Sequence, residues 1–184
     1  MFHPSHPSSI LLYPSSGSRG NLEPIPGSIG RKPGYTPDRV PIHRREKDYV
    51  GQIKGGMRPA MRIIVMGIIH KQPRSMLVTV SCPPREGDEE QEGDVGLQLT
   101  IKFPERAVIR NYRLNGKWGT EESNLSFFPF AAGESFKMEI VCEHQQFRIL
   151  VDGQPLCGFT HRVTQLASLT SLRVGGDLQL TKVA

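Results

Sequence analysis

The feature that most constrains the fold is a series of short runs in which apolar and polar residues alternate. In residues 95–103, VGLQLTIKF, apolar side chains take every second position from Val95 to Phe103, while Gln98, Thr100 and Lys102 fall between them. Successive side chains of a strand point to opposite faces. This run therefore predicts a strand with one buried face and one polar face. Residues 136–143, FKMEIVCE, alternate in the same way.

Similar runs of strand length, separated by turn residues, follow one another from Tyr49 onward. They cover residues 62–69, 76–82, 95–103, 107–112, 136–143, 147–153, 171–174 and 177–183. Asp152 and Gly153 predict a tight turn that brings the chain back along the segment starting at Gln154. Helical spacing is confined to one short turn expected within residues 162–169. We therefore expect an all-β fold, a two-sheet antiparallel sandwich of the jelly-roll type.

The first 47 residues have a different composition. They hold eight of the fifteen prolines, together with repeated Gly and Ser. Proline removes backbone donors and glycine raises the entropy lost on ordering, so such a segment does not build a core. We predict a disordered, basic tail over residues 1–47 and one domain over residues 48–184. Docking of the tail on a partner remains an alternative.

The net charge of +5 does not indicate a nucleic-acid partner. Residues 1–47 contain seven basic and three acidic residues, a net +4, so the remaining residues total only +1. A basic tail on a nearly neutral domain lacks the basic face, interleaved with aromatic residues, that nucleic-acid recognition uses. We expect no nucleic-acid binding.

Compartment and cofactors follow from what the sequence lacks. No run approaches the roughly 18 apolar residues of a membrane-spanning helix, and the N-terminus is a poor secretory signal, so we expect a cytoplasmic protein without a membrane span.

Cys82, Cys142 and Cys157 are widely spaced and odd in number, which favours three reduced thiols over a disulfide or zinc site. The acidic run at residues 85–94 favours a solvated loop over a calcium site. We expect no metal and no cofactor.

Catalytic motifs are also missing. The histidines are scattered, no serine lies in a Gly-x-Ser-x-Gly sequence, and no phosphate-binding glycine loop follows a strand. Glu121 and Glu122 are adjacent, so on a strand they point to opposite faces and cannot act as an acid and base pair. We therefore expect no enzymatic activity and no catalytic residue.

One constellation favours sugar binding. The single tryptophan, Trp118, lies in a polar, turn-rich stretch, NGKWGTEES, rather than in an apolar run. An indole beside Asn111 and Glu121 can stack on a sugar ring while the amide and carboxylate bind hydroxyl groups. A tryptophan packed against the edge of the sandwich is the alternative.

Residues 49–184 contain the strings GGMRP, FFPF followed by GESFKMEI, FRILVDG and GGDLQL. With these strings the segment resembles the galectins, the β-galactoside-binding jelly-roll lectins. The sugar site of that family has His-x-Asn-x-Arg on one strand, Asn on the next, and then Trp-x-x-Glu-x-Arg. Three of these seven positions keep the family residue here: Asn111, Trp118 and Glu121. Four are altered: Gln98, Thr100, Lys102 and Ser123.

The alterations predict loss of lactose binding. A ligand bound between millimolar and tens of micromolar has only about 4 to 6.5 kcal/mol of binding free energy. Charge-assisted hydrogen bonds contribute roughly 1.5 to 3 kcal/mol each, and two arginine positions are lost together. The strings GQIKGGMRP, VMGII, EIVCEHQQFRILVDG and GDLQLTK also resemble the galectin-related, lactose-nonbinding type.

Two hypotheses follow from this resemblance. The first is a galectin-fold protein with a degenerate sugar site that acts through contacts with an unknown protein partner. The second is a lectin of weakened or altered specificity for neutral, β-galactoside-type glycans. The sequence leaves the partner, the oligomeric state and export without a signal peptide open.

Overall fold

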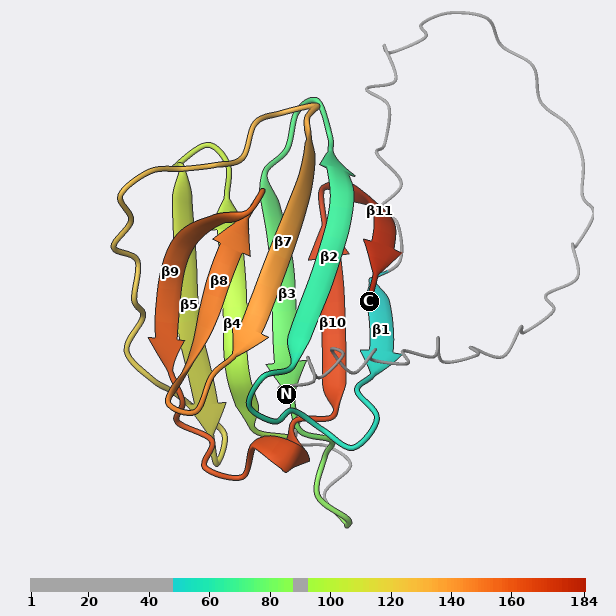
Figure 1. Cartoon of the computed structure of the whole chain (residues 1–184), viewed down its shortest axis with the longest axis vertical. Helices are drawn as coiled ribbons and strands as arrows, with labels where there is room; N and C mark the ends of the chain where they lie inside the picture. Colours follow the sequence, from blue (N-terminus) through green and yellow to red (C-terminus); the bar gives the residue numbers. More distant parts are fainter. Residues whose placement is uncertain (1–47, 88–92) are drawn as a thin grey trace, which may run out of the picture.

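Two antiparallel sheets packed face to face form the fold (Figure 1). The computed structural model describes residues 48–87 and 93–184. One sheet has six strands, in the order β1 (Tyr49–Gln52), β10 (Ser171–Gly176), β3 (Ser75–Ser81), β4 (Val95–Lys102), β5 (Ala107–Leu114) and β6 (Lys117–Trp118). The other has five, in the order β11 (Leu178–Val183), β2 (Arg62–Ile69), β7 (Ser135–Cys142), β8 (Gln146–Val151) and β9 (Gln154–Thr160). The predicted all-β, two-sheet antiparallel sandwich is confirmed.

The hydrophobic core lies between the two sheets and is built from the alternating runs. All five apolar residues of residues 95–103 are at most 9% exposed, which confirms their predicted place in the core. On the opposite face of β4, Gln98 and Thr100 are partly buried and Lys102 is exposed. β7 follows the same rule, because Phe136, Met138, Ile140 and Cys142 all belong to the core. The period-two pattern therefore determines which face of each sheet points outward.

Two tight hairpins have positive φ at both central residues, as a type I′ turn requires. Asp152 and Gly153, with φ of 51° and 80°, connect β8 to β9 and confirm the predicted return of the chain. Asn115 and Gly116, with φ of 50° and 76°, connect β5 to the two-residue strand β6. This second hairpin positions Trp118 beside β5.

Most predicted runs coincide with strands to within one or two residues at each end, and residues 62–69 coincide fully with β2. The strands β1 and β6 were not predicted, because four and two residues are too few to show a period. The expected helical turn is the 3-10 helix η1 (Leu166–Ser168). The predicted tail, residues 1–47, and the middle of the acidic run, residues 88–92, lie outside the described residues.

Candidate functional site

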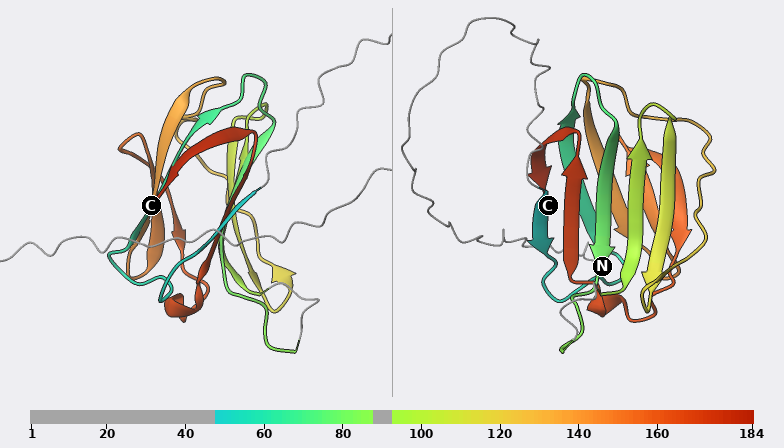
Figure 2. Two further views of the ribbon diagram at one scale, coloured as in Figure 1. Left: turned by 90° about the vertical axis from the view of Figure 1, so that its right-hand side faces the viewer. Right: turned by 180° about the vertical axis from the view of Figure 1, so that it is seen from behind.

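A hollow of about 470 Å³ lies on the outer face of the six-stranded sheet, over β4, β5 and β6. Figure 2 shows this face in its right-hand view, from behind. The lining residues are Gln98, Thr100, Lys102, Ile109, Asn111, Trp118, Gly119 and Glu121. Six of the seven residues singled out from the sequence therefore lie around one hollow, and Ser123 is not among those that line it.

The pairing of β4 with β5 determines which side chains are neighbours. Gln98 pairs directly with Asn111, and Thr100 pairs with Ile109. Side chains of directly opposed residues lie on one face with Cβ atoms about 4.5 to 5.5 Å apart. The pairing therefore brings three polar side chains and the apolar Ile109 together on the floor of the hollow.

Asn111 faces the hollow but is held by the protein itself. Its side chain is 7% exposed. Its Nδ2 donates to the carbonyl oxygen of Gly119 at 3.1 Å, and its Oδ1 accepts from the backbone N–H of Tyr112 at 2.8 Å. One amide N–H and one lone pair remain for a ligand.

Trp118 forms one wall and is 47% exposed. It pairs with Arg113 across the β5–β6 hairpin, and the guanidinium carbon of Arg113 lies 5.6 Å from the centre of the indole ring. This cation–π contact orients the indole. An oriented, half-exposed indole can stack on an apolar ligand face.

The charged residues of the hollow, Lys102 and Glu121, are both exposed. Neither forms a hydrogen bond or ion pair with another residue of the described part of the chain. Glu122 points to the other side of the sheet, as expected for neighbours on an extended segment, and its Oε2 lies 3.2 Å from Nη2 of Arg162. The hollow thus presents one free cation and one free carboxylate on its rim.

A second hollow, of about 410 Å³, adjoins the first and shares Gln98 and Trp118 with it. It extends over β3 and β10, where Thr79 and Arg173 contribute polar groups. Together the two hollows form an open groove across the outer face of the six-stranded sheet. We call this surface the groove below.

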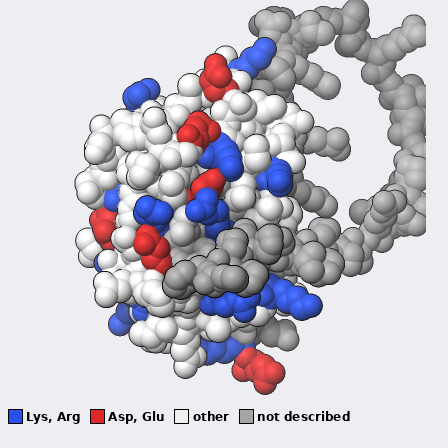
Figure 3. Space-filling model, viewed as in Figure 1, with Lys and Arg blue, Asp and Glu red and all other residues white. Residues whose placement is uncertain are grey.

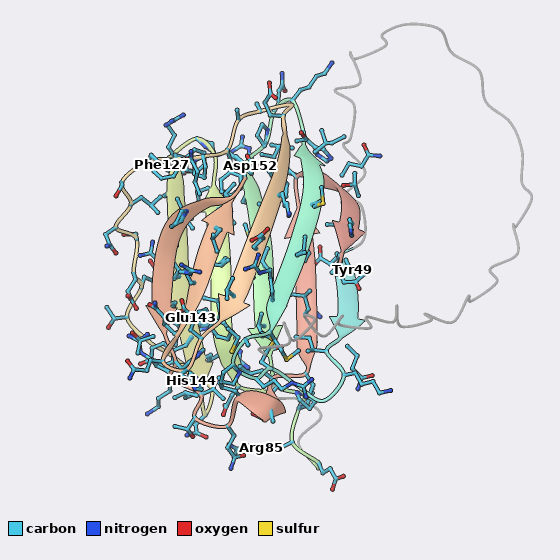
Figure 4. All side chains as sticks on the ribbon, viewed as in Figure 1. Tyr49, Arg85, Phe127, Glu143, His144 and Asp152 are labelled. Atoms are coloured by element: carbon cyan, nitrogen blue, oxygen red, sulfur yellow. The ribbon has the colours of Figure 1, made fainter. Side chains whose placement is uncertain are left out.

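A larger hollow, with a volume of about 760 Å³, lies elsewhere, by the β7–β8 turn. Glu143 and His144 are among the residues that line it and are labelled in Figure 4. Glu143 already has partners, since its Oε1 lies 3.3 Å from Nε of Arg148 and its carbonyl oxygen lies 2.8 Å from Nε2 of His161. We therefore regard the groove, with its unpaired charges and exposed indole, as the better candidate site.

The described residues show no metal or membrane feature. No group of three or more His, Cys, Asp or Glu residues in this part could hold a metal ion. Within the same residues, no helix is long and apolar enough to cross a membrane.

The three cysteines are free thiols, and burial raises their pKa values. For Cys142 the pKa is raised to about 11. A thiol is nucleophilic only as the thiolate, so all three are poor nucleophiles at neutral pH.

Sequence reasoning missed Ile109, Arg113 and Gly119: Ile109 and Gly119 line the 470 Å³ hollow, and Arg113 lies over the indole ring of Trp118. The first two were within reach, because residues 109, 111 and 113 share one face of a strand by period two. Gly119 contributes its backbone carbonyl to Asn111, and a backbone contact of this kind leaves no signal in a sequence.

Comparison with known families gives a match to the Galactoside-binding lectin family over residues 48–184. Galectin-4 of Sus scrofa is 31% identical over 162 residues, which are 87% of this chain and 48% of that protein. The chain thus spans about half the length of this relative.

Two solved structures are similar in fold. Sheep galectin-11, in complex with glycerol, aligns with a TM-score of 0.65 and 20% identity over 76% of this chain and 97% of that one. Galectin LEC-6 of Caenorhabditis elegans aligns with a TM-score of 0.59 and 19% identity, over 70% and 85% of the two chains.

Proposed function

The chain belongs to the galectin family of galactoside-binding lectins, and on that premise we propose that its groove is a degenerate sugar site that does not bind lactose. The protein then acts through contacts with another protein, without enzymatic activity, as a member of the galectin-related type. The groove is the surface that we assign to that role.

The observation that carries the proposal is the absence of a guanidinium group among the residues that line the 470 Å³ hollow. The family pattern has two arginines, and the corresponding residues here are Lys102 and Ser123. An arginine presents a planar fork of donors that can hold a carboxylate and a sugar hydroxyl together. Lysine is a compact point charge, and no hydrogen bond or ion pair links Lys102 to Glu121.

The other two altered positions remove further polar contacts. Gln98 and Thr100 are the residues that correspond to the histidine and asparagine of the family pattern. Both can form hydrogen bonds, but they differ in length and geometry from the family residues. Four altered positions, each worth about 1 to 3 kcal/mol, are comparable with the whole binding free energy of a weak lectin.

A second candidate function is a lectin with weakened or altered specificity for neutral glycans. It is favoured by Trp118, half-exposed beside Asn111 and Glu121 in the same hollow. We expect anionic glycans to bind less well than neutral ones, because the resemblance to the galectins implies that the acidic run of residues 85–94 lies beside the sugar site and would repel them.

A screen of immobilised neutral and anionic glycans, applied to the full chain, separates the two candidates. The first predicts no signal above background. The second predicts a signal with neutral glycans that disappears in Trp118→Ala. Phe127→Ala is the matched control, because Phe127 is an aromatic residue that does not line the groove (Figure 4). Its exposed fraction, 41%, is close to the 47% of Trp118. Binding abolished by Trp118→Ala and retained by Phe127→Ala would refute the first candidate.

A further inference from the structure

A fourth hollow, of about 280 Å³, lies where β5 of one sheet and β9 of the other run along the same side of the sandwich (Figure 1). The segment that follows β6 completes it. The lining residues are Arg110, Glu122, Asn124, Leu125, Ser126, Leu156, Cys157 and Gly158. None of them lines the groove, which lies on the other face of β5.

The hollow contains an arginine that is almost fully buried. Arg110 is 2% exposed. Its Nη1 donates to the carbonyl oxygens of Val108 and Asn124 at 3.1 and 3.0 Å, and its Nη2 donates to Oδ1 of Asn124 at 2.8 Å. All three acceptors are neutral.

Arg110 therefore has donors left over. A guanidinium carries five N–H groups, and the three bonds above leave the Nε–H and one N–H of Nη2. The Nε atom is buried and has no hydrogen-bond partner among residues 48–87 and 93–184. These two donors point from the same edge of the guanidinium plane, so they form a fork of the kind that binds two oxygen atoms of an oxyanion.

The charge of Arg110 is also uncompensated at short range. Within the described residues, no carboxylate lies within 4.0 Å of its guanidinium, and Glu122 is engaged with Arg162. Arg162 in turn lies over the ring of Phe159, at 4.7 Å from the ring centre. Burying a cation without an anion is unfavourable, and an anion in the hollow would offset part of that penalty.

From these observations we infer that the hollow binds a small oxyanion, a carboxylate or a phosphate group, through the free edge of Arg110. The hydroxyl group of Ser126, in the same lining, can donate a further hydrogen bond. This site is independent of the groove and of any sugar bound there.

Cys157 provides the measurement, because it lines the same hollow and is partly exposed. We propose alkylation of the full chain with N-ethylmaleimide at about pH 8, with the rate at each cysteine followed by peptide mass spectrometry. Inorganic phosphate at ten times its dissociation constant should slow labelling of Cys157 about tenfold. Cys82, equally a partly exposed thiol but outside this hollow, should label at an unchanged rate.

The variants test the fork and the hollow separately. Arg110→Lys keeps the charge but cannot present the fork, so the phosphate effect should disappear. If Arg110→Lys does not fold, substitutions at the exposed Ser126 test the same proposal. Ser126→Asp introduces a carboxylate that repels or replaces the anion and should abolish the effect, whereas the similarly sized Ser126→Asn should retain it.

Three anions at equal ionic strength identify the chemistry. Protection by phosphate or acetate, with none by chloride, supports the proposal, and the stronger of the two identifies a phosphate group or a carboxylate as the natural occupant. Equal slowing of Cys157 and Cys82, equal protection by chloride, or protection that survives Arg110→Lys or Ser126→Asp would overturn it.

Discussion

The two outer faces of the sandwich use charged residues in opposite ways. On the five-stranded sheet, Glu139 is 5% exposed. Its Oε2 lies 2.8 Å from Nη1 of Arg62, and its Oε1 lies 3.1 Å from Nζ of Lys137. Figure 3 shows basic and acidic side chains interspersed over this face. On the six-stranded sheet, Lys102 and Glu121 lie on the rim of the groove and pair with no described residue.

The difference teaches where to look for binding. A charge held by neighbours on its own sheet stabilises the fold, and its donors and acceptors are already used. An unpaired charge beside a hollow contributes little to stability and keeps its hydrogen-bonding capacity for another molecule. Asn111 is an exception to this contrast between the two faces. It faces the groove, yet both its Nδ2 and its Oδ1 already form hydrogen bonds within the protein.

The largest expected effect is on the five-stranded face. Replacing Arg62 and Lys137 by Met leaves the buried carboxylate of Glu139 without a cation, and we expect the free energy of unfolding to fall by about 3 kcal/mol. Urea denaturation measures the loss. Adding Glu139→Leu to the double variant removes the buried charge and should recover most of the stability. Failure to recover it would show that the charge of Glu139 is not what the two cations compensate.

Asn111→Ala should have the next largest effect on stability. It leaves the Gly119 carbonyl oxygen without its donor, at a cost of about 1 to 2 kcal/mol. Gln98→Ala, a change on the paired residue of β4 that faces the same hollow, is the control and should stay within about 0.5 kcal/mol. Equal losses in the two variants would contradict the structural role of Asn111.

The smallest expected effect is at the unpaired charges. Lys102→Met and Glu121→Gln should each change the free energy of unfolding by less than about 0.5 kcal/mol, since neither side chain has a partner to lose. The same denaturation experiment measures both. A loss of 1 kcal/mol or more, by the approximate scale of surface substitutions, would mean that these residues stabilise the fold after all.

Much of the fold was predictable, because burial of one face imposes a period of two on several strands. Residues 95–103 illustrate this, since their alternation identifies both the strand and its buried face. Residues 62–69 are nearly all apolar, so they predict a strand but do not identify its buried face. The two-residue strand β6 was not predictable from period, although Asn115 and Gly116 carry the turn signal that creates it.

The site was predictable only in part, for a related reason. A motif names residues by their spacing, and six of those named do lie together. Which of them are already engaged depends on contacts such as that of Asn111 with Gly119, eight residues further along the chain. The buried fork of Arg110 is likewise invisible in the sequence, because Asn124, which supplies two of its three acceptors, comes from a segment without a pattern.

The central claim is that four altered side chains remove lactose binding from an otherwise intact groove. It is tested most directly by titrating lactose to about 10 mM while following the fluorescence of Trp118, the single tryptophan of the chain. The two proteins to compare are the unaltered chain and the quadruple variant Gln98→His, Thr100→Asn, Lys102→Arg and Ser123→Arg. We predict no saturable change for the unaltered chain. For the variant we predict saturable binding, with a dissociation constant at least about 100-fold below that of the unaltered chain. Saturable binding by the unaltered chain anywhere in this range would contradict the claim.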